Sequence, residues 1–221
     1  MTYCVGMLLD AGLVCLSDSR TNAGVDHINT FRKMNVFERP GERVLVLMSA
    51  GNLAVTQTLV SLLRERLAAE GPNLHTVSNM LEAARHVGDC LREVHARDAE
   101  ALHEFGIEFN ANFILGGQIQ GEVPRLMHIY AAGNFIEATP DTPYFQIGEA
   151  KYGKPIIDRV IRPETLLDEA AKCALISMDS TIRSNLSVGL PLDLLVLRKD
   201  ALVVCSAIRI DAENAYFEMI R

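Results

Sequence analysis

The sequence lacks an excess of basic residues. It contains 21 Lys and Arg against 28 Asp and Glu, which gives a formal net charge of −7. Proteins that bind nucleic acid commonly carry a basic patch that neutralises the phosphates. We therefore expect no nucleic acid among the partners of this chain.

Paired cysteines are also lacking. The five cysteines are scattered, odd in number and free of any CxxC pair: Cys4, Cys15, Cys90, Cys173 and Cys205. This pattern fits reduced thiols better than a disulfide framework. We therefore expect a cytoplasmic protein without structural disulfides.

A signal peptide and a membrane span are not expected either. Residues 1–17 have no basic leader and no small-residue cleavage site after them. Residues 44–63 carry no charge over twenty positions, a length that is nominally sufficient to cross a bilayer. However, Ser49, Asn52 and Gln57 would need hydrogen-bond partners inside the lipid. A buried strand that runs into an amphipathic helix is the better interpretation, and we expect no membrane partner.

The chain has no internal repeat, no low-complexity tract and no Ser/Gly-rich linker. Hydrophobic residues make up 49% of the sequence and charged residues 22%, which is ordinary for a globular protein. We therefore predict a single domain over residues 1–221.

The apolar pattern predicts strands, two helices, strands, two helices and strands, in that order. Leu59, Leu63 and Leu67 recur at four-residue steps, and a longer stripe of the same kind covers residues 77–94, as is typical of helices. The other two helices are expected at 150–161 and 165–186, and the strands at 3–9, 13–17, 33–37, 44–48, 111–116, 126–131, 144–147, 192–197 and 202–210. Because hairpins dominate, this order predicts an α+β fold, a four-layer αββα sandwich of two antiparallel sheets.

Thr2 is a candidate nucleophile. It follows Met1 and is small enough for the initiator Met to be removed, which would leave a free α-amine on Thr2. Such a residue combines a nucleophile with a base, because its Oγ can attack a carbonyl while its own amine accepts the proton. Many proteins begin with Met-Thr without using it, so this feature alone does not identify an enzyme.

The predicted first hairpin brings charged residues close to Thr2. If the turn lies at residues 10–12, Thr2 is opposite residues 19–21, beside Asp18 and Arg20. A strand end has little structural need for a carboxylate and a guanidinium, so both are candidates for a functional site. The alternative is a solvated strand end closed by an ion pair.

Lys33 and Gly51 are further candidates. A Lys beside Thr2 would favour deprotonation of its Oγ, and Asp18 would hold the ammonium in place. Gly51 lets the backbone come close to a ligand, and its N–H can stabilise the oxyanion of a tetrahedral intermediate. The alternatives are a strand-end Lys in water and a plain strand-to-helix turn.

Several motifs of the chain belong together. In the first half they are Thr2, Ser17-Asp18-Ser19-Arg20 with Gly24, Lys33-Met34 and Met48-Ser49-Ala50-Gly51, and in the second half Ile114–Gly117, Tyr144–Gly148 and Ser187–Gly189. Jointly they resemble the proteasome β-subunit family of N-terminal-nucleophile hydrolases, over nearly the whole chain. The closest resemblance, from Thr2 to Met34, is to the bacterial ancestral-β-subunit (Anbu) peptidases.

The resemblance implies roles for these residues. Thr2 would be the nucleophile, Asp18 and Lys33 would orient and activate it, and the Gly51 N–H would line the oxyanion hole. Asn22 would pair with an extended peptide through its backbone. The remaining substrate-binding residues would be Arg20, Ser49 and Leu53.

Some positions depart from the pattern of this family. The spacing from Thr2 to Lys33 is one residue shorter, and Glu149 stands where the family has a Ser close to the amine. Ser184 replaces the usual acidic residue, three positions before the matching Ser187. Asp179 cannot substitute for it, because five residues along a helix turn the side chain by about 140°. We therefore expect Glu149, Ser184 and Ser187 to form an altered support for the α-amine.

Two other patterns do not lead to a ligand site. Residues 148–155 nearly match a phosphate-binding loop, but Pro155 replaces the final Ser or Thr that would bind Mg²⁺. His86, His95 and His103 do not share one helix face, so surface histidines are a better interpretation than a zinc site with Cys90. We expect no metal and no cofactor.

The sequence thus predicts a threonine-type peptidase or amidase that cleaves peptide bonds through an acyl-enzyme. The expected partners are a peptide or unfolded protein substrate and further copies of the chain, arranged as a ring or an open helical stack. Any unfoldase would be a separate protein. The alternative, favoured by Glu149 and Ser184, is a catalytically weak or vestigial scaffold that self-assembles and binds a protein or peptide partner.

Overall fold

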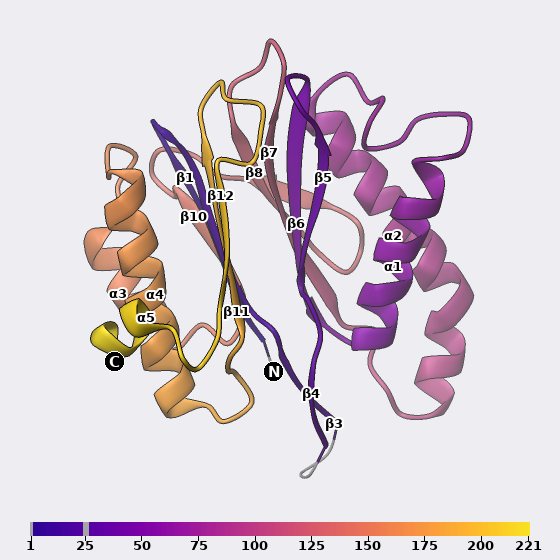
Figure 1. Cartoon of the computed structure of the whole chain (residues 1–221). Helices are drawn as coiled ribbons and strands as arrows, with labels where there is room; N and C mark the ends of the chain where they lie inside the picture. The colour runs from indigo at the N-terminus through magenta and orange to yellow at the C-terminus, as the bar shows by residue number, and fades with distance from the viewer. Residues whose placement is uncertain (1, 24–26) are drawn as a thin grey trace.

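A computed structural model describes residues 2–23 and 27–221 of the chain (Figure 1). The predicted removal of Met1 and the motif position Gly24 lie outside these described residues. Strands with apolar side chains, several of them buried on both faces, build two five-stranded antiparallel sheets at the centre of the molecule.

The amino-terminal strand lies inside the first sheet, between two neighbours, so it is held along both edges. In spatial order this sheet contains β10 (Tyr144–Gly148), β1 (Tyr3–Leu9), β2 (Gly12–Asp18), β11 (Leu192–Arg198) and β12 (Ser206–Ile210).

The second sheet faces the first, and its strands follow each other in chain order. They are β5 (Met34–Arg39), β6 (Arg43–Gly51), β7 (Ala111–Ile119), β8 (Arg125–Ile129) and β9 (Phe135–Glu137). A separate two-stranded ribbon, β3 (Arg20–Ala23) and β4 (His27–Thr30), projects beyond the two sheets (Figure 1).

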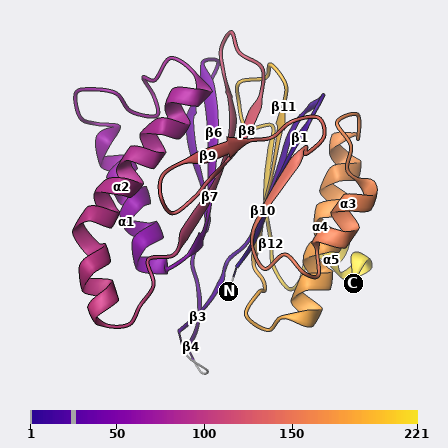
Figure 2. The same cartoon turned by 180° about the vertical axis from the view of Figure 1, so that it is seen from behind.

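Helices cover the outer face of each sheet (Figures 1 and 2). α1 (Leu53–Arg66) and α2 (Met80–Glu104) lie on the second sheet. α3 (Lys154–Val160) and α4 (Leu167–Ser184) cover the first sheet, and the short α5 (Ala215–Ile220) packs against α4. The predicted four-layer αββα sandwich is confirmed.

Strand β6 shows how the three apolar layers arise. Val44, Val46 and Met48 pack between the two sheets, whereas the alternating Leu45 and Leu47 face α1 and α2. Successive side chains of a strand point to opposite faces, so a strand that is apolar at every position is buried on both. A third cluster fills the space between the first sheet and α4. Each fully buried Leu contributes roughly 1.5–3 kcal/mol to folding.

The structure adds four elements to those that the apolar pattern predicts: β3, β4, β9 and α5. All are short and partly exposed, so they carry little hydrophobic periodicity. The last strand begins at Ser206, later than the predicted residue 202, because Asp200 and Leu202 adopt φ angles of 64° and 48° that an extended strand excludes. The third helix begins at Lys154 with Pro155 in its first turn, where proline is tolerated.

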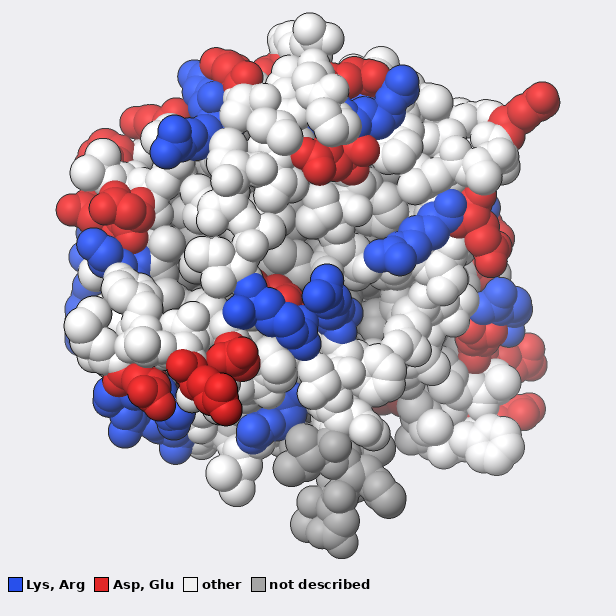
Figure 3. Space-filling view, viewed as in Figure 1, with Lys and Arg blue, Asp and Glu red and all other residues white. Residues whose placement is uncertain are grey.

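The uncharged stretch 44–63 forms most of β6 and most of α1. In the described part of the chain, no helix combines the length and the apolar content that a membrane span requires. Figure 3 shows acidic and basic side chains interspersed over one face of the molecule.

Candidate active site

The β1–β2 hairpin has the predicted register. Leu9 pairs with Gly12 around the tight turn, and Cys4 pairs with Ser17. Continued by two residues, this antiparallel register places Thr2 opposite Ser19, next to the end of β2. The hairpin therefore brings the start of the chain to the carboxylate that ends β2.

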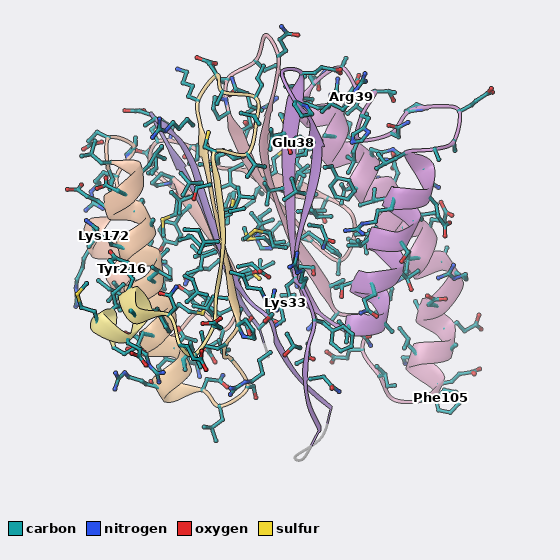
Figure 4. All side chains as sticks on the ribbon, viewed as in Figure 1. Lys33, Glu38, Arg39, Phe105, Lys172 and Tyr216 are labelled. Carbon is teal, nitrogen blue, oxygen red and sulfur yellow. The ribbon has the colours of Figure 1, made fainter. Side chains whose placement is uncertain are left out.

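Asp18 and Lys33 form a buried ion pair. The Lys33 Nζ lies 2.7 Å from Asp18 Oδ1, and the two side chains are 5% and 0% exposed. Lys33 also donates to the Arg20 carbonyl oxygen at 2.7 Å. Figure 4 shows Lys33 between the two sheets, near the end of the sandwich where the chain begins. The position of the ammonium is therefore set by two acceptors, and Lys33 lines the same cleft as Thr2.

Backbone groups complete the surroundings of Asp18. Its Oδ1 accepts from the Tyr3 N–H at 3.0 Å, and its Oδ2 accepts from the Gly189 N–H at 3.4 Å. Burial raises the pKa of Asp18, while the Lys33 ammonium and the two N–H groups act in the opposite direction. The pair needs all of these contacts because burying two charges costs free energy that the ion pair alone does not recover.

Thr2 is itself buried and held by β10. Its carbonyl oxygen accepts from the Glu149 N–H at 2.7 Å. Gly148 has a φ of 86°, and a Cβ at this position would come within 2.0 Å of the Thr2 carbonyl oxygen. Only glycine permits this approach. The backbone of Thr2 is therefore fixed by the end of a strand from the second half of the chain.

A cleft of about 970 Å³ opens beside Thr2. Its walls come from the start of β5, the end of β6 and one face of α1. Five of the predicted site residues line it: Thr2, Lys33, Ser49, Gly51 and Leu53. Asp18 lies behind Lys33 and touches the cleft only through it.

The turn from β6 to α1 requires a glycine at position 51. Gly51 has a φ of 118°, and a Cβ there would come within 2.2 Å of the Asn110 carbonyl oxygen. Asn52 follows and caps α1, since its side chain accepts from the N–H groups of Ala54 and Val55. This backbone geometry explains why position 51 is a glycine. The proposed role of the Gly51 N–H in stabilising an oxyanion remains a prediction.

Ser49 links the two strands that carry the cleft. Its N–H donates to the Lys33 carbonyl oxygen at 3.0 Å, and its Oγ lies 3.4 Å from the same oxygen. Leu53, the first residue of α1, lines the same cleft.

Arg20 and Asn22 lie on β3, at the edge of this region. The Arg20 Nη1 donates to the Leu186 carbonyl oxygen at 3.0 Å, and a Cβ on Gly189 would come within 2.4 Å of the Arg20 Cζ. The guanidinium therefore packs on the loop after α4 and is not among the residues that line the cleft. Asn22 pairs with Ile28 in the ribbon.

Glu149 is held by Asn185, a residue that the sequence analysis does not single out. Glu149 Oε2 accepts from Asn185 Nδ2 at 2.9 Å, and Asn185 Oδ1 accepts from the Ser187 N–H at 3.0 Å. The structure thus links Glu149 and Ser187 through Asn185. Ser184, by contrast, is the exposed last residue of α4. Asp179 pairs with Arg183 and Arg221 instead.

The remaining reactive side chains lie apart from this site or are inert. Burial raises the pKa of the Cys15 thiol to about 12 and raises that of Cys4 as well, so both stay protonated near neutral pH. In the described ranges, no group of three or more His, Cys, Asp or Glu residues is arranged to hold a metal ion. Gly153, in the segment that nearly matches a phosphate-binding loop, packs against the Tyr3 ring.

Comparisons with known proteins agree on one family. A family model described as proteasome subunit matches residues 2–196. The chain is 59% identical to Anbu (ancestral beta-subunit) from Yersinia bercovieri, with a TM-score of 0.93 over 99% of this chain and 90% of that one. It is 52% identical to a structure from Pseudomonas aeruginosa described as a helical assembly of the Anbu complex, with a TM-score of 0.95 over 99% of this chain and 90% of that one. An Anbu (Gly-1) mutant from Hyphomicrobium sp. strain MC1 is 54% identical, with a TM-score of 0.93 over 100% of this chain and 91% of that one. Curated proteins give no match.

Proposed function

Because the chain belongs to the proteasome subunit family, we propose that it is an N-terminal threonine peptidase or amidase. The observation that carries this proposal is the buried Lys33–Asp18 pair at the wall of the cleft that Thr2 also lines. A hydroxyl, a cation that favours its ionisation and a space for an extended substrate are the parts that acyl transfer needs.

The proposed reaction begins once Met1 has been removed and the Thr2 amine is free. The Thr2 Oγ attacks the substrate carbonyl, and the α-amine of the same residue accepts the hydroxyl proton. A free α-amine has a reference pKa of roughly 7.7–8.0, so a sizeable fraction is neutral near neutral pH. Lys33, held by Asp18, stabilises the negative charge on Oγ as it develops.

The second half of the reaction releases the two products. The Gly51 N–H stabilises the oxyanion of the tetrahedral intermediate. As the peptide C–N bond breaks, the leaving amine takes its proton from the Thr2 ammonium, and an ester remains on Thr2. Water then attacks this ester, the α-amine accepts a proton of that water, and the acid product leaves while Thr2 Oγ regains its proton.

An extended peptide would bind by adding a strand beside residues 20–24 and 49–53. Asn22 would contribute backbone hydrogen bonds, and Ser49 and Leu53 would contact the substrate side chain. Arg20 would support the substrate site indirectly. Its carbonyl oxygen accepts a hydrogen bond from Lys33, and its guanidinium donates to the loop after α4. Glu149 and, through Asn185, Ser187 would support the amine side of Thr2, whereas the exposed Ser184 would take no part in it.

We further propose that residues 1–221 act as one subunit of a homo-oligomer, either a ring or an open helical stack. The Pseudomonas relative, whose structure is described as a helical assembly, supports this idea. The five free cysteines fit a place in the cytoplasm. The substrates would be peptides or unfolded proteins, and any unfoldase would be a separate chain.

The scaffold alternative is favoured by one observation. The Glu149 carboxylate is occupied by Asn185 and by the Lys151 N–H, where the family has a serine close to the amine. A vestigial site of this kind would bind a peptide or protein partner without forming an acyl-enzyme.

Covalent labelling distinguishes the two functions. Protein whose intact mass shows the loss of Met1 is treated with a peptide that carries a carbon electrophile, and the modified residue is located by mass spectrometry. Labelling of Thr2 that disappears in Thr2→Ala supports the peptidase. Labelling that persists in Thr2→Ala, or a chain that keeps Met1 in cells, would count against it.

A further inference from the structure

The cleft beside Thr2 carries positive charge without an acidic counterpart. Arg32, Lys33 and Arg64 line it, whereas no Asp or Glu is found among its described lining residues. Lys33 is already paired with Asp18. The whole chain has a net charge of −7, so this cleft differs in sign from the molecule around it, because Arg32 and Arg64 form no ion pair with a carboxylate of the described residues.

One face of α1 forms a wall of this cleft. Its lining residues recur at steps of three and four positions, as a single helix face requires: Leu53, Thr56, Gln57, Val60, Ser61 and Arg64. Leu53 and Arg64 are about 16 Å apart along the helix axis. Helical side chains lean toward the amino-terminal end, so the Arg64 guanidinium extends back toward the site.

Asn35 holds the Arg64 guanidinium at the far end of the cleft. The Arg64 Nη2 donates to Asn35 Oδ1 at 2.9 Å, across the gap between α1 and β5. Asn35 lies two residues after Lys33, which is about 7 Å along an extended chain. The guanidinium is therefore held at a strand position two residues beyond the proposed catalytic lysine, within the same cleft.

Arg64 keeps most of its hydrogen-bonding capacity for a ligand. Over residues 2–23 and 27–221, no carboxylate lies within ion-pair distance of it, and the residue is exposed to the solvent of the cleft. Arg66, only two positions later, points to the other side of α1 and is paired with Glu93. The difference between these neighbours shows that Arg64 is oriented into the cleft without an internal counter-charge.

We infer that the cleft selects a peptide with an acidic side chain, glutamate in preference to aspartate, at the residue whose carbonyl group Thr2 attacks. This inference rests on the proposed function. Arg64 would bind the carboxylate through two parallel N–H···O bonds, with Asn35 keeping the guanidinium in place. Arg32 adds to the attraction, and Ser49 and Leu53 flank the aliphatic part of the side chain. A lysine or arginine at the same position would be repelled.

Binding tests this selectivity without requiring turnover. Fluorescent peptides that differ only in a C-terminal amidated Glu, Gln, Leu or Lys are titrated against full-length Thr2→Ala protein by fluorescence anisotropy. We expect the Glu peptide to bind about 10- to 100-fold more tightly than the Gln peptide. Adding Arg64→Gln should abolish this ratio, and Arg64→Glu should favour the Lys peptide. Arg159→Gln, which removes an exposed arginine from α3, is the matched control and should keep the ratio.

The outcomes separate this inference from the peptidase proposal. Equal binding of the Glu and Gln peptides, a preference that survives Arg64→Gln, or no binding of any peptide would overturn acidic selectivity. Electrophilic versions of the same peptides are then applied to wild-type protein. Labelling of Thr2 without a preference for Glu would support the peptidase proposal and overturn acidic selectivity. Glu-selective binding without labelling of Thr2 would support acidic selectivity and count against the peptidase proposal.

Discussion

Asp18 receives hydrogen bonds from three distant parts of the chain. Tyr3 N–H, Lys33 Nζ and Gly189 N–H all donate to its carboxylate, which is fully buried. Removing one partner of a buried pair leaves the other charge without compensation, which costs more than the intact pair contributes. Stability and the proposed chemistry therefore depend on the same side chain.

Asp18→Asn tests this dependence. We expect the free energy of unfolding, measured by urea denaturation, to fall by about 3–5 kcal/mol. The control is Asp89→Asn, which breaks the exposed Arg92–Asp89 pair on α2 and should cost less than about 0.5 kcal/mol. Equal losses in the two variants would contradict the assigned burial of the Asp18–Lys33 pair.

The buried thiols make the free energy of unfolding depend on pH in the alkaline range. Burial raises the pKa of Cys15 from its ordinary value of 9.0 to about 12. Above pH 9 the unfolded chain loses this proton while the folded chain keeps it, so stability is intact below pH 9 and falls as the pH rises toward 12. Each such thiol contributes a slope of about 1.4 kcal/mol per pH unit.

Urea denaturation between pH 8 and pH 11 measures this slope. Cys15→Ala should make it shallower by the contribution of one thiol, whatever the variant loses in packing at neutral pH. Val14→Ala truncates a neighbouring buried side chain of β2 without removing a thiol and should leave the slope unchanged. If both variants kept the wild-type slope, the raised pKa of Cys15 would be refuted.

At the scale of elements, the junction of β6 and α1 positions the cleft. Gly51 allows the sharp turn, and Asn52 caps the helix whose face forms the cleft wall. Loss of the cap should loosen the first turn of α1, where Leu53 lies, before it affects the rest of the helix.

We expect Asn52→Ala to lower the free energy of unfolding by about 1 kcal/mol, within a range of roughly 0.5–2 kcal/mol, because two N–H groups of α1 lose their acceptor. Asn52→Ser keeps a capping oxygen and should recover most of the loss. Chemical denaturation of the two variants side by side is sufficient, and identical stabilities would show that the cap does not contribute.

The sequence analysis predicts the elements that carry strong periodicity, and five of the site residues that it proposes from motifs line one cleft in the structure. The turn at residues 10–12 sets the hairpin register, and this register alone brings Thr2 to Asp18. Asn185 and Arg64 were not predicted as site residues. Asn185 reaches Glu149 from an irregular loop, and Arg64 lies eleven residues along α1 from Leu53, so neither shows a local pattern that points to the site.

At the scale of the whole molecule, the proposed homo-oligomer requires that the chain associate with copies of itself. A subunit that contacts the next one head to tail forms a ring or an open helix, depending on whether the rotation closes. Sedimentation velocity across a wide concentration range should show species well above the 24.3 kDa of a single chain. Monomers at every concentration would count against the assembly and leave the fold and the cleft unaffected.

The way Thr2 is anchored has a consequence for biosynthesis. The Thr2 carbonyl oxygen accepts a hydrogen bond from the Glu149 N–H, and the Asp18 carboxylate accepts one from the Gly189 N–H. A ribosome makes the threonine almost first and these two supports long afterwards. A nascent chain consequently cannot complete the surroundings of Thr2 and Asp18 until Gly189 has been translated, so the proposed active site forms only in a nearly finished polypeptide.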